Sequence, residues 1–238
     1  MFADRSFTKP PGVLSVAQIR QVDAVAVRDF GMNSLVLMEN AGRGCADFID
    51  ARLNRSSGIV VLCGPGNNGG DGLVIARHLH AMGHQISLWM IAERGKLSQD
   101  ADANLRIVEH TKIRISWIGE RLTTPELEQA WTHLRSDCGS NLVVVDALLG
   151  TGATGQPRAL MADVLRLVNA ASLHRVAIDI PTGLDAETGK PSDTTFQADI
   201  TLTFVAKKPG FAESSAAAFL GEVRVLPIGV PPEVFDRI

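Results

Sequence analysis

Apolar residues follow two patterns along the chain, a helical spacing near the N-terminus and continuous short runs beyond it. Ser15 and Gln18 form a capping-box pattern ahead of apolar positions at helical spacing, which predicts a helix that ends near Gly31. Asn33 or Ser34 can cap a second helix, predicted to continue to about residue 50. The chain is therefore expected to begin with two helices.

Short apolar runs of strand length then recur at regular intervals. The first, GIVVLCG at residues 58–64, has no charged position, as expected for a strand that is covered on both faces. Four similar runs lie at 85–92, 113–119, 141–149 and 175–181, and helical stretches lie near 99–110, 124–135 and 158–171. Two last strand patterns, at 198–206 and 221–229, follow without a full-length helix between them, so an irregular far edge of the sheet is expected.

This alternation of strands and helices determines the expected fold class. Strand and helix in turn favour right-handed βαβ crossovers and a mainly parallel sheet. We expect an α/β protein with one doubly wound domain over residues 15–238, which includes the two additional N-terminal helices, after an arm at residues 1–14. In such sheets ligands bind beyond the carboxyl ends of the strands. The loops at 64–72, 146–156 and 179–189 should therefore face one crevice.

The composition mainly excludes classes of protein, such as nucleic-acid-binding, membrane and secreted proteins. The formal net charge of −3 gives no general attraction to nucleic acid or to an anionic membrane. No apolar run approaches the ~18 residues that a membrane span needs, and the N-terminus lacks the apolar core of a secretory signal. The three cysteines have no C-x-x-C spacing and are expected to be buried thiols. These features place the protein in the cytoplasm.

The first glycine-rich stretch contains a contradiction. Gly64, Gly66 and Gly69 satisfy G-x-G-x-x-G, the dinucleotide fingerprint. Asp71, however, stands near the expected helix start, where the helix dipole favours an anion, so its carboxylate would repel a pyrophosphate. No Lys followed by Ser or Thr is present, which excludes a Walker A loop. A tight turn that an Asp caps is the alternative interpretation.

The second glycine-rich stretch, Gly150 to Gly155, repeats the spacing without a carboxylate. Backbone amides and the hydroxyls of Thr151 and Thr154 could hold a phosphate there without repulsion. The alternative is a flexible connection between strand and helix. Two such loops after two different strands make that alternative less attractive.

Two carboxylates stand near the ends of apolar strands. Asp179 is a candidate for proton transfer, because burial can bring the pKa of a carboxyl group towards neutrality. Asp146 indicates oxygen ligation of a cation, and neutral oxygens from Asn68 and Thr182 would suit potassium better than zinc. Asp185, in a turn, fits a carboxylate that accepts hydrogen bonds from turn amides.

Four polar residues outside these loops are open to two interpretations. Lys207 and Lys208 end a strand and could contact an anion, but two solvated lysines are the safer interpretation. Glu39 and Asn40 could cover the crevice from the second helix or simply be solvated.

Five stretches together carry a resemblance to a known family. LMENAG, GPGNNGGDGLVIARHL, DALLGTGATG, DIPTGLDAETG and ADITLTFVAKKPG occur in this order. The chain, from about Ser15 onwards, closely resembles the YjeF N-terminal domain family, the NAD(P)H-hydrate epimerases. The resemblance implies a Rossmann-like fold. It also implies epimerisation at C6, the hydroxyl-bearing carbon of hydrated NADH or NADPH, which repairs damaged cofactor.

The resemblance also implies which residues form the site. Asp179 is expected to contact the substrate and to be the catalytic acid–base residue. The implied ligands of one potassium ion per subunit are Asn68, Asp146 and Thr182, where the family often has Ser in place of Thr182. The remaining implied substrate-binding residues come from the two loops: Asn67, Asn68, Gly69, Gly70, Asp71, Gly150, Thr151, Gly152, Ala153, Thr154, Gly155 and Gln156.

Further expectations concern the partners, the mechanism and the alternative functions. A separate dehydratase polypeptide and a homodimer are expected from the resemblance, with no nucleic acid or membrane partner. Epimerisation requires reversible loss of the C6 hydroxyl or opening of the ring, and the sequence favours neither route. A non-catalytic binding module of the same fold is the alternative function, but it would have no need of the three ion ligands and Asp179 together. An ordinary dehydrogenase lacks an evident catalytic set here.

Overall fold

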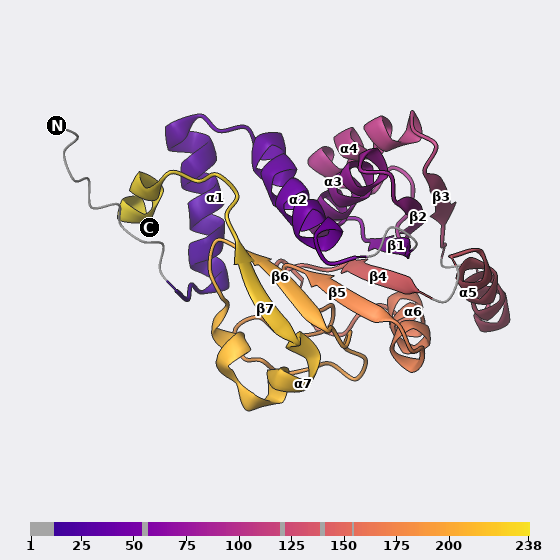
Figure 1. The fold of residues 1–238 in the computed structure, drawn as a ribbon. Coiled ribbons are helices and arrows are strands. Elements are labelled where there is room, and N and C mark those ends of the chain that lie inside the picture. Colours follow the sequence, from indigo (N-terminus) through magenta and orange to yellow (C-terminus); the bar gives the residue numbers. More distant parts are fainter. Residues whose placement is uncertain (1–11, 54–56, 120–121, 139–140, 154) are drawn as a thin grey trace.

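The core of the fold is one sheet of seven parallel strands in the order β3-β2-β1-β4-β5-β6-β7 (Figure 1). The computed structural model describes residues 12–53, 57–119, 122–138, 141–153 and 155–238. The strands are β1 Gly58–Cys63, β2 Gln85–Met90, β3 Arg114–Trp117, β4 Leu142–Ala147, β5 His174–Ile178, β6 Ile200–Phe204 and β7 Glu222–Leu226. The order reverses between β1 and β4, so the predicted doubly wound α/β fold is confirmed.

Helices cover both faces of this sheet (Figure 1). They are α1 Val16–Phe30, α2 Ser34–Asp50, α3 Asn67–Ala81, α4 Gln99–Glu109, α5 Thr124–Cys138, α6 Ala159–Ala170 and the short α7 Ala217–Leu220. In β1, Ile59 and Val61 pack in the core with α1 to α4, whereas Val60 and Leu62 pack with α5 and α6. This alternation follows from the two-residue period of a strand, and it explains why β1 is apolar throughout.

Local hydrogen bonds place the first two helices as the sequence predicts. Ser15 Oγ accepts from the Gln18 amide at 3.2 Å and Gln18 Oε1 accepts from the Ser15 amide at 3.0 Å, which completes the capping box. Asn33 caps α2, because its Oδ1 accepts from the Leu35 amide at 2.9 Å. The Leu14 amide donates to the Lys207 carbonyl at 3.0 Å and so ties the start of α1 to the segment after β6.

The first glycine-rich stretch is mostly helix, which differs from the expected loop. Only Gly64 to Gly66 form the connection, and α3 begins at Asn67, so Asp71 lies in the second helical turn. A side chain on Gly64 would come within 1.9 Å of the Leu148 carbonyl oxygen. The backbones after β1 and β4 therefore approach closely, and glycine is required there for space.

The far end of the sheet is regular in its strands and irregular in its connection. β7 pairs with β6 in parallel over five positions, whereas residues 209–220 form two short 3₁₀ turns and α7 instead of a long helix. The expected absence of a full-length helix is confirmed, and the expected irregular edge is wrong. Among the described helices, none is both long and apolar enough to span a bilayer.

Candidate functional site

A cavity of about 560 Å³ lies beyond the carboxyl ends of the central strands. Its wall combines residues of α1, α2, the start of α3, the segment after β4 and the ends of β5 and β6. Eight residues that the sequence assigns to substrate or ion binding line it: Asn67, Asn68, Asp71, Gly150, Thr151, Gly152, Ala153 and Asp179. The structure thus brings both glycine-rich stretches and Asp179 to one cavity.

Four residues assigned to substrate binding have other surroundings, and a fifth, Thr154, lies outside the described residues. The assigned ion ligands Asp146 and Thr182 do not line this cavity either. A side chain on Gly69 would come within 2.0 Å of the Gly64 carbonyl oxygen, and one on Gly70 would overlap Met38, so both glycines serve close packing. Gly155 and Gln156 line a smaller neighbouring cavity of about 190 Å³, not the main one. None of these four lines the main cavity.

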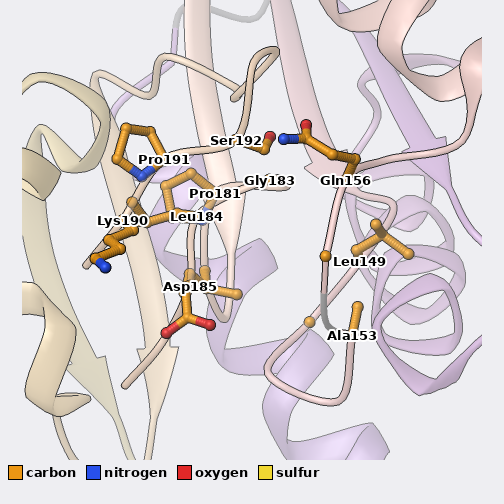
Figure 2. Close-up of a pocket in the computed structure, with 13 residues that line it drawn as sticks. Leu149, Ala153, Gln156, Pro181, Gly183, Leu184, Asp185, Lys190, Pro191 and Ser192 are labelled. Atoms are coloured by element: carbon orange, nitrogen blue, oxygen red, sulfur yellow. The ribbon is translucent and has the colours of Figure 1, made fainter. Parts of the chain in front are cut away.

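The smaller cavity adjoins the segment after β4 (Figure 2). Leu149, Gly150 and Ala153 contribute to the walls of both cavities. Gln156 is held by the opposite wall of the smaller cavity, because its Oε1 accepts from the Asp193 amide at 3.0 Å. Figure 2 shows Asp185 and Lys190 on that opposite wall. The two cavities therefore share the glycine-rich segment as part of their walls.

Two adjacent strand ends carry unusual backbone geometry. Asp179, after β5, has φ of 66° and Val205, after β6, has φ of 67°. Each is the centre of a three-residue turn, closed by the Ile180 amide to the Ile178 carbonyl at 2.8 Å and by the Ala206 amide to the Phe204 carbonyl at 2.7 Å. Such positive φ costs about 1–3 kcal/mol per residue and is concentrated at functional sites.

Asp179 forms an ion pair with Lys208, one of the two lysines for which the sequence left contact with an anion open. Lys208 Nζ donates to Asp179 Oδ1 at 2.6 Å, and the Thr151 amide donates to Oδ2 at 3.0 Å. The Lys208 side chain is completely buried and also donates to Thr203 Oγ1. The expectation of two solvated lysines is therefore wrong for Lys208, although Lys207 is exposed.

This ion pair reverses the expected pKa shift of Asp179. Burial alone would raise the pKa of Asp179, but the Lys208 ammonium and the hydrogen bonds from Lys208 and Thr151 lower it below its ordinary value. The expected shift towards neutrality is wrong. Asp179 is a carboxylate at neutral pH and is ready to accept a proton. Lys207 and Lys208 lie beyond the end of β6 at Phe204 and beyond the turn at Val205, so no strand period distinguished the buried lysine from the exposed one.

Asp146 is a second buried carboxylate, and its surroundings are different. Its Oδ1 accepts from the Thr182 hydroxyl at 2.8 Å and from the Leu148 amide at 3.1 Å, and its Oδ2 accepts from the Thr182 amide at 2.8 Å. Burial raises the pKa of Asp146 to about 6, against the lowering effect of these hydrogen bonds. Within the described parts of the chain, no lysine, arginine or histidine pairs with it.

Asn68 contributes two buried polar atoms without a partner. Neither its Oδ1 nor its Nδ2 makes a hydrogen bond to any described residue. Leaving such groups unpaired costs roughly 1–3 kcal/mol. An oxygen free to bind, together with the oxygens of Asp146 and Thr182, is the donor set that a hard monovalent cation prefers. The residues present therefore fit the potassium ion that the resemblance implies.

Three polar side chains that the sequence did not connect with one another complete the cavity wall. Arg20 and Asp23 come from α1, and Asp100 comes from the first turn of α4. Burial and the negative charge of Asp179 raise the pKa of Asp23 to about 6, although Lys208 opposes this. Burial, with Asp179 as the next cause, raises the pKa of Asp71 well above its usual range. The α1 residues resemble any exposed helical positions, so no sequence pattern marked them.

Glu39 and Asn40 serve packing between elements and do not line the cavity. Glu39 accepts from Arg77 and pairs with His78 at 2.7 Å, which joins α2 to α3. The Asn40 amide donates to the Ile228 carbonyl at 3.0 Å. The idea that they cover the crevice is therefore wrong, and the alternative of plain solvation is incomplete.

Similarity to known proteins agrees with this arrangement. The family described as YjeF-related protein N-terminus matches residues 34–210. A Rhodopirellula baltica protein named NAD(P)H-hydrate epimerase is 42% identical over 228 residues, which covers 96% of this chain and 88% of that protein. A Pirellula staleyi protein of the same name is 40% identical and is covered over 93% of its length.

Two further comparisons concern the length that the chain covers and its fold. A Salinibacter ruber protein named bifunctional NAD(P)H-hydrate repair enzyme Nnr is 38% identical, and this chain spans 42% of its length. The crystal structure of the yeast protein ynu0 superimposes with a TM-score of 0.71 at 19% identity, over 92% of this chain and 94% of that one, and so supports the fold. The matched region holds both glycine-rich stretches, Asp146 and the Asp179–Lys208 pair, and the chain belongs to the family described as YjeF-related protein N-terminus.

Proposed function

We propose that this protein is an NAD(P)H-hydrate epimerase, an isomerase that interconverts the R and S epimers of hydrated NADH and NADPH. The observation that carries the proposal is the ionised Asp179, which stands in a cavity beside a neutral glycine-rich segment. Near full-length similarity to two proteins named for this activity supports it. The hydrated nucleotide is the substrate and not a cofactor.

The two parts of the substrate need different surroundings. Gly152 offers a backbone without negative charge, which suits the diphosphate, whereas the Thr151 amide already donates to Asp179 at 3.0 Å. Arg20 lies nearby, since a side chain on Gly152 would come within 3.9 Å of its guanidinium. The hydrated nicotinamide then belongs near Asp179, at the strand end. In this arrangement Asp71 contributes to the ring end and does not oppose a phosphate.

Inversion at C6 requires proton transfer but no external reagent. C6 bears a hydroxyl group and the ring nitrogen, so either loss of the hydroxyl or ring opening makes this carbon planar or free to rotate. Re-addition from the other face inverts it. Asp179 accepts a proton from the incoming water or from the C6 hydroxyl group. Lys208 keeps the Asp179 carboxyl group in position through their hydrogen bond.

A potassium ion belongs to the proposal through Asn68, Asp146 and Thr182. The unpaired Asn68 amide and the unpaired charge of Asp146 support this assignment. When bound, the ion would supply the positive charge that this side of the site lacks. Thr182 also holds the segment after β4 in position, because its Oγ1 accepts from the Leu149 amide at 3.1 Å.

The cellular setting follows from the same reaction. An epimerase only exchanges two forms, so we expect coupling to a dehydratase activity that consumes one of them. The name of the Salinibacter ruber relative is bifunctional, which supports such coupling. A homodimer and a cytoplasmic location are also part of the proposal.

The deciding experiment uses the two hydrate epimers after separation. Each is incubated with the protein at neutral pH, and its conversion is followed by chromatography against an enzyme-free control, because the epimers also interconvert spontaneously. Exchange faster than the control in both directions supports the proposal. Binding without exchange would instead indicate a binding module, and hydride transfer would indicate a dehydrogenase.

A further inference from the structure

We propose that Asp23, on α1, is a second catalytic residue, which donates the proton that Asp179 cannot supply. This inference rests on the proposed epimerase function. Asp23 lines the same cavity as Asp179 but comes from a helix, whereas Asp179 comes from a strand end. In Figure 1, α1 stands at the end of the sheet towards which β5 and β6 point. The two carboxyl groups therefore approach a bound ring from different walls.

The Asp179–Lys208 pair creates the need for a separate donor. Lys208 Nζ lies 2.6 Å from Asp179 Oδ1, so Asp179 begins the reaction without a proton. Hydroxide is a poor leaving group, and departure of the C6 oxygen requires a proton at that oxygen. Lys208 has no access to the substrate, because its side chain is completely buried. An acid elsewhere on the cavity wall must supply the proton.

The proton balance closes with these two carboxyl groups. When the C6–O bond breaks, its electron pair stays on oxygen, which takes the proton of Asp23 and leaves as water, while the N1 lone pair forms a C=N bond. Water then adds to the other face of C6 and loses a proton to Asp179. In the ring-opening route, Asp179 takes the hydroxyl proton, the C6–N1 pair stays on nitrogen and Asp23 protonates it. In the hydroxyl-loss route one proton has then moved from Asp23 to Asp179, and solvent restores it. In the ring-opening route N1 closes onto the other face of the C6 aldehyde, and both protons return to the groups from which they came.

Among the titratable residues that line the described cavity, Asp23 suits the donor role best. Arginine does not give up its proton, which excludes Arg20. Asp100 comes from the first turn of α4, and the carboxyl group on which its charge acts is that of Asp71. Asp71 follows β1 on α3 and so stands on the strand-end side, as Asp179 does. Asp23 lines the cavity with an accessible carboxyl group, and desolvation at the cavity wall with the charge of Asp179 raises its pKa to about 6, close to the neutral pH at which proton exchange is most efficient.

The position of Asp23 is secured by contacts at the start of α1. The Leu14 amide donates to the Lys207 carbonyl at 3.0 Å, next to Lys208 in the chain. The Val16 amide donates to Glu187 Oε1 at 2.6 Å, in the segment that follows β5. Both contacts connect α1 to the segments that carry Lys208 and Asp179. The two carboxyl groups are therefore held relative to each other by these two contacts.

The test compares substitutions of Asp23, Asp29 and Asp71 in the otherwise intact protein. Asp23→Asn should lower kcat for epimer exchange by roughly 10²-fold or more, the typical contribution of general acid–base catalysis, with KM within about threefold. Asp23→Glu should recover part of that loss. Asp29→Asn is the matched control, because Asp29 lies on the same helix outside the cavity and should exchange epimers like wild type. Thermal unfolding verifies that each variant is folded.

Three results would overturn the inference. The first is a kcat for Asp23→Asn within about threefold of wild type, and the second is a change in KM alone, which would make Asp23 a binding residue. The third is a larger loss of kcat in Asp71→Asn than in Asp23→Asn, which would identify Asp71 as the donor. Wild-type exchange is measured first, and its absence would refute the epimerase function itself, together with the role of Asp23.

Discussion

Two carboxylates at neighbouring strand ends, Asp146 on β4 and Asp179 after β5, show how differently one residue type can be used. Both are largely buried, and both accept hydrogen bonds from backbone amides. Asp179 has the buried ammonium of Lys208 at 2.6 Å, whereas Asp146 has only neutral donors from the described chain. The pKa of Asp179 is therefore lowered and that of Asp146 is raised.

The difference separates proton handling from cation binding. A buried charge is stable only when another charge compensates it. Asp179 has its compensating charge inside the protein, so its carboxylate is maintained without a ligand. Asp146 has none among the described residues, and the proposed potassium ion beside the unpaired amide of Asn68 would supply it. Four experiments test this contrast, in order of decreasing expected effect.

The largest effect is expected from Asp179→Asn, which keeps the size of the side chain but cannot accept a proton. The epimer-exchange rate should fall ~10²–10⁴-fold, while ligand binding is largely retained. Asp185→Asn is the control, because this carboxylate accepts from the Thr188 and Glu187 amides in the same segment and should lose little rate. Exchange by Asp179→Asn within a few-fold of wild type would reduce Asp179 to a binding residue.

Lys208→Met should destabilise the protein and change its pH dependence. Removing one partner of a buried ion pair costs about 3–5 kcal/mol in the free energy of unfolding, because the other charge remains uncompensated. Urea unfolding at neutral pH should show this loss, and Lys207→Met, at the exposed neighbour, should not. A loss below about 1 kcal/mol would contradict the internal compensation of Asp179.

The pH dependence of the same variant has a definite sign. In wild type the pKa of folded Asp179 lies below its ordinary value of 3.8, so its contribution to stability is present above that value and is lost as the pH falls through the folded pKa. In Lys208→Met, burial raises this pKa instead. The deficit should therefore shrink as the pH falls, and the limb of the rate profile due to Asp179 should move to higher pH.

Potassium should stabilise the wild-type protein through Asp146. A ligand at 100 times its Kd adds about 2.7 kcal/mol to the free energy of unfolding, so the thermal midpoint should rise when potassium replaces tetramethylammonium at equal ionic strength. Asp146→Ala should abolish this difference. Equal midpoints and equal exchange rates of wild type in the two salts, with an unchanged rate in Asp146→Ala, would refute the cation site.

The smallest effect is expected from Asn68→Leu, whose effect on the free energy of unfolding should differ in sign between the two salts. Asn68→Leu removes two buried polar atoms without a partner, so it should stabilise the cation-free protein by about 1 kcal/mol. In potassium the same substitution should destabilise, because it removes an ion ligand. Thermal midpoints of both proteins in the two salts measure this difference, and Asn67→Leu, which alters the exposed neighbour, is the control. The same sign in both salts would argue against Asn68 as a ligand.

Much of the fold follows from local patterns that the structure retains. The capping box at Ser15 and the cap at Asn33 begin α1 and α2 where the sequence predicts them. Helices predicted near 99–110 and 158–171 are observed at Gln99–Glu109 and Ala159–Ala170. These elements depend on side chains within a few residues of one another, and the sequence contains that information directly.

The candidate site was less accessible to sequence reasoning. The first glycine-rich stretch was expected to be a loop, yet α3 already begins at Asn67 with Gly66 as an N-cap that lacks a side chain. Glycine disfavours helices in isolation, but contacts with Gly64 and Met38 make the small residues necessary. Tertiary packing overrode the local propensity there.

The sequence by itself determined the parallel α/β architecture, the family and the residues at the strand ends, because period, caps and motifs are local properties. Only the tertiary structure decided which charges meet. Lys208 lies 29 positions after Asp179 in the chain, and α1 brings Asp23 to the same cavity from the other end of the protein. A pKa depends on burial and on charges within a few ångströms. Neither quantity can be obtained until the fold has placed these distant residues beside one another.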